Sequence, residues 1–436
     1  MDTKKLRQKI LDLAIRGKLV PQDPNDEPAS VLLERIRAEK EQLIKEGKIK
    51  RSKKSVASDT SHYENVPFEV PESWCWATIG ELFQLQAGKF IEAPQISTCK
   101  DATHIYPCYG GNGLRGYVES YNRDGLFPII GRQGALCGNI NIAEGKFYAT
   151  EHAVVVETFA NIDIQLFVYF LIQLNLNQYA TATAQPGLAV KTINEVPIPL
   201  PPINEQHRIS MAIEKSLDTL SEIDQSKHAI RKSILQLKSR ILDLAISGKL
   251  AAQDCSDEPA LELLRRINPS YASCDNRHYR NVPKGWAVCT FEDILEYEQP
   301  QQYIVNSTDY SDEYEIPVLT AGKSFIIGKT NEKLGICKHL PVIIFDDFTT
   351  DSKYVDFPFK VKSSAMKILH AKGNVNPKYV AYLMYVTRLV GDTHKRYWIS
   401  EYSKIPIMLP PVNEQERIVS LIEKIYDRLD KILAEL

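Results

Sequence analysis

The chain has 436 residues, of which 44% are hydrophobic and 25% charged, and its formal net charge at pH 7 is −2. This length suits two to four domains of ordinary size, and the near-neutral charge gives no global signal for nucleic acid or membrane. The eight cysteines form no C-x-x-C pair and no Cys/His cluster, so neither a disulfide framework nor a zinc site is expected. With no apolar signal core and no membrane-length apolar run, we expect a cytoplasmic protein.

Two short helices are expected at the start of the chain. The first ends at Gly17, a Pro/Asp-rich turn follows, and Asp26-Glu27-Pro28 begins the second with an acidic cap and a proline in its first turn. Residues 35–54 then carry nine Lys/Arg against three Glu. Such a run is typical of a solvated linker, and an arm that contacts phosphates is the alternative.

Two globular stretches, residues 62–199 and 278–408, share one plan. Both open with His-Tyr-x-Asn-Val-Pro followed by a tryptophan, Trp74 or Trp286. Short apolar runs between turns indicate strands, and each stretch has one later helix, at 164–178 and 377–390. We expect two α/β domains of similar fold and divergent sequence.

A long helix separates the two stretches, from about Leu200 to Ile246. Asn204 suits its N-cap, Glu205 the positive end of its dipole and Gly248 its C-terminal cap. Its apolar residues step by seven along two seams, as in a coiled coil, and some 43 helical residues would span roughly 65 Å. The residues expected to pack the arms are Leu6, Leu13, Ile213, Leu220, Ile223, Ile230, Ile234, Leu237, Ile422 and Leu429.

An internal duplication organises the chain. Residues 6–36 match 237–267 at 20 of 31 positions, with an offset of 231, and residues 200–209 match 409–418 at 8 of 10, with an offset of 209. The C-terminal segment therefore maps onto the first half of the long helix and the N-terminal segment onto its second half, leaving only 228–231 without a counterpart. We predict a cyclic pseudo-two-fold repeat, in which two α/β domains are joined by two long coiled-coil arms. Unrelated helical ends with surface heptads are the alternative.

The predicted boundaries follow from this repeat. They are 1–61 for an N-terminal helical region and linker, 62–199 and 278–408 for the two domains, 200–277 for the central helical region, and 409–436 for the C-terminal helix.

The duplicated blocks resemble the specificity subunit of type I restriction-modification enzymes over essentially the whole chain. The blocks are I-L-D-L-A-I-x-G-K-L, Q-D-x-x-D-E-P-A and L-P-P-x-N-E-Q-x-R-I, together with the phrases at 109–113 and 131–135. The resemblance implies two target recognition domains that each read half of a bipartite double-stranded DNA site. It also implies that the two coiled-coil arms pack antiparallel, set the spacer and dock two methyltransferase subunits, which restriction subunits join. The chain itself would hold no catalytic residue, metal or cofactor, because the partner subunits bind S-adenosylmethionine and ATP with Mg²⁺.

Several polar motifs are candidates for DNA contact. Residues 111–116 fit G-x-G-x-x-G, but a strand and turn follow where a dinucleotide site needs a helix; a loop close to DNA and a plain hairpin turn remain open. Arg132 and Gln133 lie between glycines and suit guanine and adenine, respectively, although an arginine satisfied within the domain is equally consistent. The candidate DNA-binding residues are Tyr109, Asn112, Arg132, Gln133, Glu151, His152, Gln185, Lys191, Lys323, Asp346, Lys353, Ser363, Lys395, Arg396 and Ser400.

Two of these candidates have competing interpretations. His152 has no partnered nucleophile in the sequence, so base-edge or phosphate contact is favoured over catalysis. Asp346, Asp347 and Asp351 are favoured as cytosine-reading or loop acids over a metal site. We expect residues 362–364 to be the second-domain counterpart of 150–152.

Two other classes of protein compete with a DNA-specificity subunit. A self-contained DNA methyltransferase would need an N-P-P-[FY] or D-P-P-[YW] tetrapeptide, and neither occurs in the sequence. A coiled-coil adaptor carrying two protein-binding modules would lack affinity for one bipartite duplex.

Overall fold

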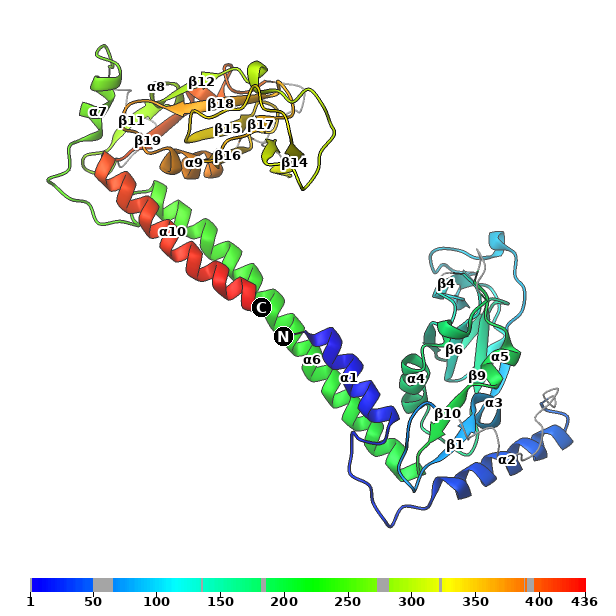
Figure 1. Ribbon diagram of the computed structural model, residues 1–436. Helices are drawn as coiled ribbons and strands as arrows, with labels where there is room; N and C mark the ends of the chain where they lie inside the picture. The colour runs from blue at the N-terminus through cyan, green and yellow to red at the C-terminus, as the bar shows by residue number, and fades with distance from the viewer. Residues whose placement is uncertain are drawn as a thin grey trace. The chain divides into compact units, whose positions relative to one another are not determined.

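The computed structural model describes residues 2–49, 66–134, 136–181, 186–272, 282–320, 324–387, 389 and 396–436. The chain divides into two compact units, Met1–Ser226 and Lys227–Leu436. This boundary falls one residue before the four positions that lack a counterpart in the sequence repeat. Each unit contains a globular domain and a pair of arm helices (Figure 1).

In unit 1 the arm pairs α1 (Thr3–Ile15) with the first half of α6 (Ile203–Ile246). The Thr3 hydroxyl donates to Asp224 at 2.8 Å, while Ala14 shares a hydrophobic core with Ile213. Because residue 3 lies beside 224 and residue 14 packs with 213, the helices run antiparallel (Figure 1).

In unit 2 the arm pairs α10 (Val412–Glu435) with the second half of α6. Lys238 pairs with Asp430 at 2.6 Å, and the Lys227 ammonium donates to the backbone oxygen of Leu436 at 2.6 Å. This pair is therefore also antiparallel (Figure 1). Each chain end thus packs along its own half of α6, as the repeat predicts.

Only one of the two predicted heptad seams is well buried. Ile213, Leu220, Ile234, Ile422 and Leu429 are at most 9% exposed, and Ile223 and Leu13 are half-buried. The prediction that Leu6, Ile230 and Leu237 pack inside the arms is wrong, because these side chains are 37%, 43% and 46% exposed. A helix with a single partner is covered on one side only, so apolar residues on its flank stay open to solvent.

The first domain contains three sheets. Strand β1 (Cys75–Thr78) pairs with β10 (Pro197–Leu200), next to the arm. A four-stranded antiparallel sheet has the order β2-β9-β6-β7, and a second has the order β4-β3-β8-β5, with β3 parallel to β8. The remaining strands are β2 (Gln84–Ala87), β3 (Tyr106–Gly110), β4 (Gly113–Val118), β5 (Arg123–Asp124), β6 (Phe127–Gly131), β7 (Ile140–Ala143), β8 (Lys146–Ala149) and β9 (Ala153–Glu157).

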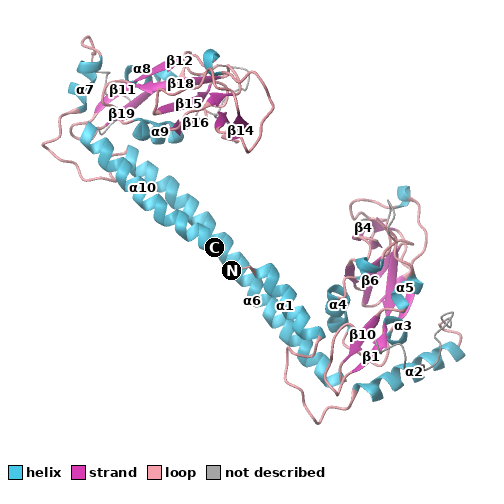
Figure 2. Ribbon diagram, in the orientation of Figure 1, coloured by secondary structure: helices cyan, strands magenta, loops and turns pink. Residues whose placement is uncertain are grey.

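Helix α4 (Ile164–Gln173) covers one face of the sheet β2-β9-β6-β7 (Figure 2). Alternation along the strands explains the layering, since Ile130 and Val154 share a core with Phe167 whereas Ile129 and Val155 face the second sheet. The other helices of this unit are α2 (Ala29–Lys45), α3 (Ile79–Leu82) and α5 (Val190–Asn194), with 3₁₀ turns η2 (Ala93–Gln95) and η3 (Leu176–Tyr179).

The second domain repeats this plan with different sequence. Its sheets have the orders β11-β19, β12-β18-β15-β16 and β14-β13-β17. The elements are α7 (Ala260–Ile267), β11 (Ala287–Thr290), α8 (Phe291–Ile294), β12 (Leu295–Glu298), η5 (Gln301–Tyr303), β13 (Ile316–Leu319), β14 (Ile326–Thr330), β15 (Val342–Asp346), β16 (Ser352–Val355), β17 (Lys360–Val361), β18 (Met366–Ala371), α9 (Pro377–Val386), η6 (Tyr402–Lys404) and β19 (Pro406–Leu409). The predicted class, two similar α/β domains on antiparallel helical arms, is confirmed.

Two predicted helix caps are wrong. Helix α6 already begins at Ile203, so Asn204 lies inside it, and its side chain donates to Asp26 at 3.3 Å. Helix α2 begins at Ala29 without a side-chain cap, because Asp26 instead accepts hydrogen bonds from Arg208.

The basic run at 35–54 is also not simply a linker. Helix α2 extends to Lys45, and Lys40 donates to the backbone oxygens of Gly80, Glu81 and Phe83. Arg37 pairs with Glu81 at 2.7 Å. The helical part of this run therefore packs on the first domain, while residues 50–54 lie outside the described part of the chain. Within that part, no helix is both long and apolar enough to cross a membrane.

Candidate nucleic-acid interface

A groove of about 460 Å³ opens on the first domain where the ends of several strands meet. It is lined by Gly110, Gly111, Asn112, Gly113, Leu114, Arg115, Gln133, Gly134 and His152. The β3–β4 hairpin, strand ends included, supplies the first six of these residues, the segment after β6 supplies two, and His152 precedes β9. We call this feature the first-domain groove.

Glycines allow the two loops of the groove to approach closely. A Cβ atom on Gly131 would lie 1.9 Å from the Gly111 backbone oxygen, and one on Gly113, where φ is +89°, would lie 2.7 Å from the Asn141 side chain. No larger residue fits these positions without moving backbone or a buried amide. The G-x-G-x-x-G phrase therefore forms a hairpin that lines a groove, which confirms the hairpin turn, while close approach to DNA stays a prediction.

Polar side-chain atoms are buried beneath the groove without partners. Thr150 Oγ1, Glu151 Oε2, His152 Nδ1 and Asn141 Nδ2 have no hydrogen-bond partner within the described part of the chain. Thr150 is fully buried, and a Cβ on the groove residue Gly110 would lie 3.7 Å from its hydroxyl. The remaining polar atoms of these two side chains, His152 Nε2 and Glu151 Oε1, lie 3.0 Å apart. Buried polar atoms are rarely left unpaired, so this cluster beside the groove is an unusual feature of the domain.

The second domain uses different residues at matching positions. The Arg132 backbone donates to His152 and accepts from Leu188, whereas the Asp347 backbone donates to Ala365 and accepts from Tyr397. Arg132 therefore corresponds to Asp347. The predicted match of 150–152 with 362–364 holds at its start, because Thr150 donates to Tyr109 as Lys362 donates to the equivalent Leu319. The loop before the later strand is one residue longer in the second domain, so the match is shifted by one at its end, where His152 corresponds to Ala365.

The acids of this second-domain loop are used within the fold. Asp346 Oδ1 accepts from the backbone nitrogens of Phe348 and Thr349, and Asp347 Oδ1 accepts from that of Trp398. Lys367 Nζ lies 3.7 Å from Asp347 Oδ2. This geometry matches the loop-acid interpretation, and the described residues contain no group of three or more His, Cys, Asp or Glu that could hold a metal ion.

The remaining candidates are spread over both domains. Tyr109 packs edge-on against Phe147, and burial raises the pKa of its hydroxyl. Lys191 is exposed on α5, Lys353 is half-buried on β16, and Ser363 is exposed before β18.

Arg396 and Ser400 lie together in one turn of the second domain. Arg396 lies over the Phe348 ring at 5.8 Å, and Ser400 donates to the Arg396 backbone oxygen. Gln185, Lys323 and Lys395 lie outside the described residues.

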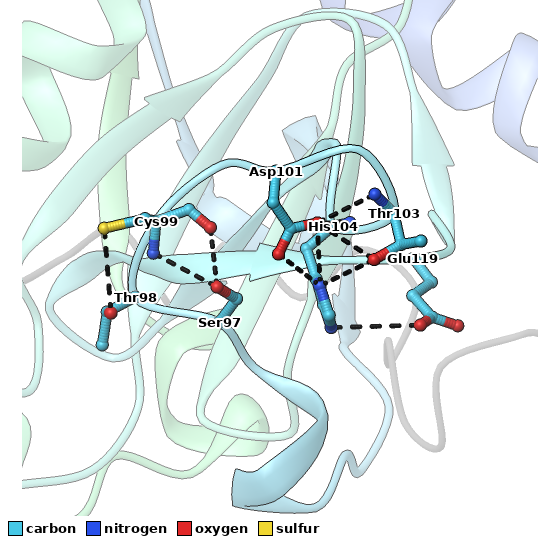
Figure 3. A network of polar contacts seen from close by, with 7 residues as sticks. All are labelled: Ser97, Thr98, Cys99, Asp101, Thr103, His104 and Glu119. Carbon is cyan, nitrogen blue, oxygen red and sulfur yellow. Dashed lines mark hydrogen bonds and ion pairs between the residues drawn. The ribbon is translucent and has the colours of Figure 1, made fainter.

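A self-contained polar loop precedes β3, at the other end of the hairpin from the groove. Asp101 accepts from the backbone nitrogens of Thr103 and His104, and the His104 ring lies 2.9 Å from Asp101 and 4.0 Å from Glu119 (Figure 3). These hydrogen bonds, led by that from the His104 backbone, depress the pKa of Asp101.

Comparison with known proteins adds a family to this geometry. Residues 71–234 and 283–436 each match the family model described as the type I restriction modification DNA specificity domain. The chain belongs to this family. The two matches cover both globular domains and most of the arm helices, so the specificity family accounts for both copies of the repeat.

Named relatives show how far the similarity extends. The chain is 42% identical to the EcoprrI specificity subunit of Escherichia coli over 167 residues, which cover 38% of this chain and 41% of that protein. The EcoAI subunit, from the same organism, is 29% identical over 67% of this chain and 62% of its own length. The chain thus spans less than two thirds of these two relatives. The Escherichia coli EcoEI subunit is 26% identical over 99% of this chain and 90% of its own length.

A solved structure shares the fold. This structure was solved to explain complex assembly and conformational transition of the type I R-M system. It matches the chain with a TM-score of 0.54 and 13% identity. The match covers 85% of this chain and 94% of the other.

Sequence reasoning missed four residues at the groove of this specificity-family chain. Arg115 and Leu114 line it, and Thr150 and Asn141 lie at its floor. Arg115 was discoverable, because it belongs to the same glycine-rich phrase as Asn112. Asn141 gave no signal, since only the pairing of β7 with β6 brings it beside Gly113.

Proposed function

We propose that the chain is the non-catalytic DNA-specificity subunit of a type I restriction-modification enzyme, and that each domain reads one half of a bipartite site. The duplication is the observation that carries this proposal: two domains of matching topology, each with its own match to the specificity family. A single-site enzyme has no need of two such copies.

Divergence at matching positions supports two different half-sites. The first domain presents Arg132 where the second presents Asp347, and His152 where the second has Ala365. Arginine favours guanine acceptors, whereas the Asp347 carboxylate is buried, accepts from the Trp398 backbone and lies 3.7 Å from Lys367. The second domain therefore cannot use this position as the first domain can, and must read its half-site with other residues.

The exposed arm residues support docking of two methyltransferase subunits. In unit 2, Leu235, Leu237 and Ile432 are 63%, 46% and 46% exposed, and in unit 1 Met211 is 57% exposed. These residues lie on different sides of their helices, so we propose them as individual contact points for a bound protein. We propose that methyltransferase subunits cover them, that restriction subunits join this complex, and that these partners bind S-adenosylmethionine and ATP with Mg²⁺.

Methylation assays test this assignment. The purified chain alone is expected to transfer no methyl group to DNA, whereas its complex with type I methyltransferase subunits should methylate adenine within one bipartite sequence. Methylation by highly purified chain without partners would overturn the non-catalytic role. A complex that binds all duplexes equally would favour the adaptor alternative.

A further inference from the structure

The same buried polar cluster occurs where each domain joins its arm. It is built by the block Leu-Pro-Pro-x-Asn-Glu-Gln-x-Arg-Ile, at 200–209 and again at 409–418. Its Glu and Gln side chains are at most 1% exposed in both units, although both are polar. We call these clusters the arm junctions.

The glutamine of each arm junction joins an arm helix to a domain helix. In unit 1, Gln206 at the start of α6 donates to the Pro201 backbone oxygen at 2.9 Å and accepts from the Asp163 backbone nitrogen at 3.0 Å. Asp163 is the N-cap of α4, which covers the main sheet of the first domain. One buried amide therefore fixes the start of α4 against the start of α6.

Unit 2 repeats these bonds with different neighbours. Gln415 donates to the Pro410 oxygen at 2.8 Å and accepts from the Asn376 nitrogen at 2.8 Å. Asn376 is the N-cap of α9, the counterpart of α4. The glutamine bonds only to backbone in both units, which explains how the contact persists while the domain sequences diverge.

A tryptophan joins each domain to both helices of its arm. Trp74 Nε1 donates to Glu205 on α6 at 2.9 Å, and a Cβ on Gly17, just after α1, would lie 3.1 Å from the indole. In unit 2, Trp286 donates to Glu414 at 3.0 Å, and a Cβ on Gly248 would lie 3.3 Å from its indole. Each indole thus lies between the end of one arm helix and the beginning of the other.

A third set of bonds attaches the segment after each arm helix. Arg208 and Asn204 on α6 both donate to Asp26, the former at 2.6 Å. Arg417 on α10 donates to Asp257 at 2.6 Å, and Asn413 to the same carboxylate at 3.1 Å. The Asn, Gln and Arg of the motif make the same bonds in both units, and its Glu accepts from the tryptophan in both. The glutamates differ at their second oxygen, because Glu205 Oε1 also accepts from Gln22 at 2.5 Å whereas Glu414 Oε1 has no partner among the described residues.

We infer that the arm junctions set the orientation of each recognition domain on its arm, so that Gln206 and Gln415 are positioning residues for the spacer between half-sites. This inference rests on the proposed function. Simple core packing could have used apolar residues here, whereas directional bonds to backbone fix an angle between two elements. A fixed angle is what a reader of two half-sites needs to reject the wrong spacing.

The test compares Gln206→Leu and Gln415→Leu with the wild type, each assembled with methyltransferase subunits. Methylation is measured on duplexes that hold both half-sites constant and vary the spacer one base pair at a time. Both variants should lose about ten-fold in discrimination against neighbouring spacer lengths, while their half-site sequences stay the same. Trp74→Phe, which removes the donated bond together with part of the indole's packing, should act in the same direction and carries the test if a leucine variant does not fold.

Val155→Ala is the matched control, because it truncates a fully buried side chain of the first domain away from the junction. It should lower the melting temperature without changing spacer discrimination. The inference is overturned if the junction variants keep wild-type spacer discrimination, or lose activity equally at all spacers as a destabilised domain does. A wild-type complex that requires no bipartite site would instead defeat the proposed function.

Discussion

Gln133 is the residue whose position in the first-domain groove most directly suits base reading. Its side chain is exposed at the groove wall, and an amide can pair with adenine through two hydrogen bonds. Gln133→Ala should therefore relax one base position of the first half-site, at a cost of about 1–3 kcal/mol. Methylation of a randomised half-site library measures this. A uniform loss over all sequences would show that Gln133 does not read a base.

Lys191→Ala should show how a residue that contacts phosphate differs from the base-reading Gln133. Lys191 is exposed on α5 and does not line the groove. Its loss should weaken binding evenly across sequences and lower the slope of log affinity against log salt by about 1. Binding titrations of the methyltransferase complex at several salt concentrations measure that slope; a sequence-dependent loss would contradict this role.

Two carboxylates of the unit 1 junction, Asp26 and Glu205, make the stability of the fold depend on pH in opposite directions. The hydrogen bond from Arg208 holds the pKa of Asp26 below its ordinary 3.8, so the stability it adds is present at neutral pH and is lost as pH falls through its lowered pKa. Burial raises the pKa of Glu205, so its contribution is largest at low pH and is lost as pH rises through that pKa.

Asp26→Asn should therefore lower the free energy of unfolding at pH 7 by about 1–2 kcal/mol, a value limited by the partly exposed Arg208. The difference from wild type should shrink as pH falls below 3.8. Denaturant unfolding over this pH range checks it, with Asp257→Asn as the equivalent change in unit 2. A difference that stays constant with pH would exclude the ion pair as its cause.

At the residue scale, the sequence identifies the important motifs more reliably than it predicts the contact that each residue makes. The Leu-Pro-Pro blocks stand out by repetition, but Asn204, which suits a helix cap, binds Asp26 instead. Local pattern cannot show a partner that is far away in the chain, such as Asp26 for Arg208. The use of Asp346 to bind loop amides is likewise decided by backbone geometry.

At the scale of elements, the arms separate residues that stabilise the fold from residues open to partners. Ile422 is fully buried on α10, whereas Ile432 on the same helix is 46% exposed. Ile422→Ala should lower the free energy of unfolding by about 2–5 kcal/mol, and Ile432→Ala by less than about 0.5 kcal/mol. The second variant should nevertheless weaken assembly with methyltransferase subunits. Chemical denaturation and a binding titration distinguish the two effects; normal assembly by Ile432→Ala would remove this residue from the docking surface.

Heptad spacing predicts the arm helices, but only half of the residues that it predicts to pack inside the arms are buried. The seam through Ile213 and Ile234 is covered, while Ile230 and Leu237 are not. A seven-residue pattern records every apolar position on a helix, including those that another protein would cover. The end of α2 also escapes prediction, because tertiary contacts of Lys40 with α3 hold a charged helix that composition alone suggests is a linker.

At the scale of the whole molecule, α6 is the single element shared by the two units. Four residues inserted between Ser226 and Lys227 would add about one turn, or ~6 Å. This distance is close to two base pairs at about 3.4 Å each, so the preferred spacer should lengthen by one to two base pairs while both half-sites stay unchanged. Methylation of duplexes that differ only in spacer length measures this. An unchanged spacer would show that α6 does not set the separation.

The internal duplication makes the plan of the whole molecule predictable from sequence alone. Offsets of 231 and 209 locate the two copies, and unit boundaries at Ser226 and Lys227 agree with the cyclic repeat. The half-site sequences are not predictable in this way, because they depend on divergent loops such as those holding Arg132 and Asp347.

Mapping methylated adenines in DNA from cells that express the chain with type I methyltransferase subunits tests the central claim most directly. The account predicts one bipartite sequence with two different half-sites and a spacer of constant length, and predicts that Gln133→Ala alters only one half. A continuous recognition sequence, or a change of both halves in that variant, would contradict it.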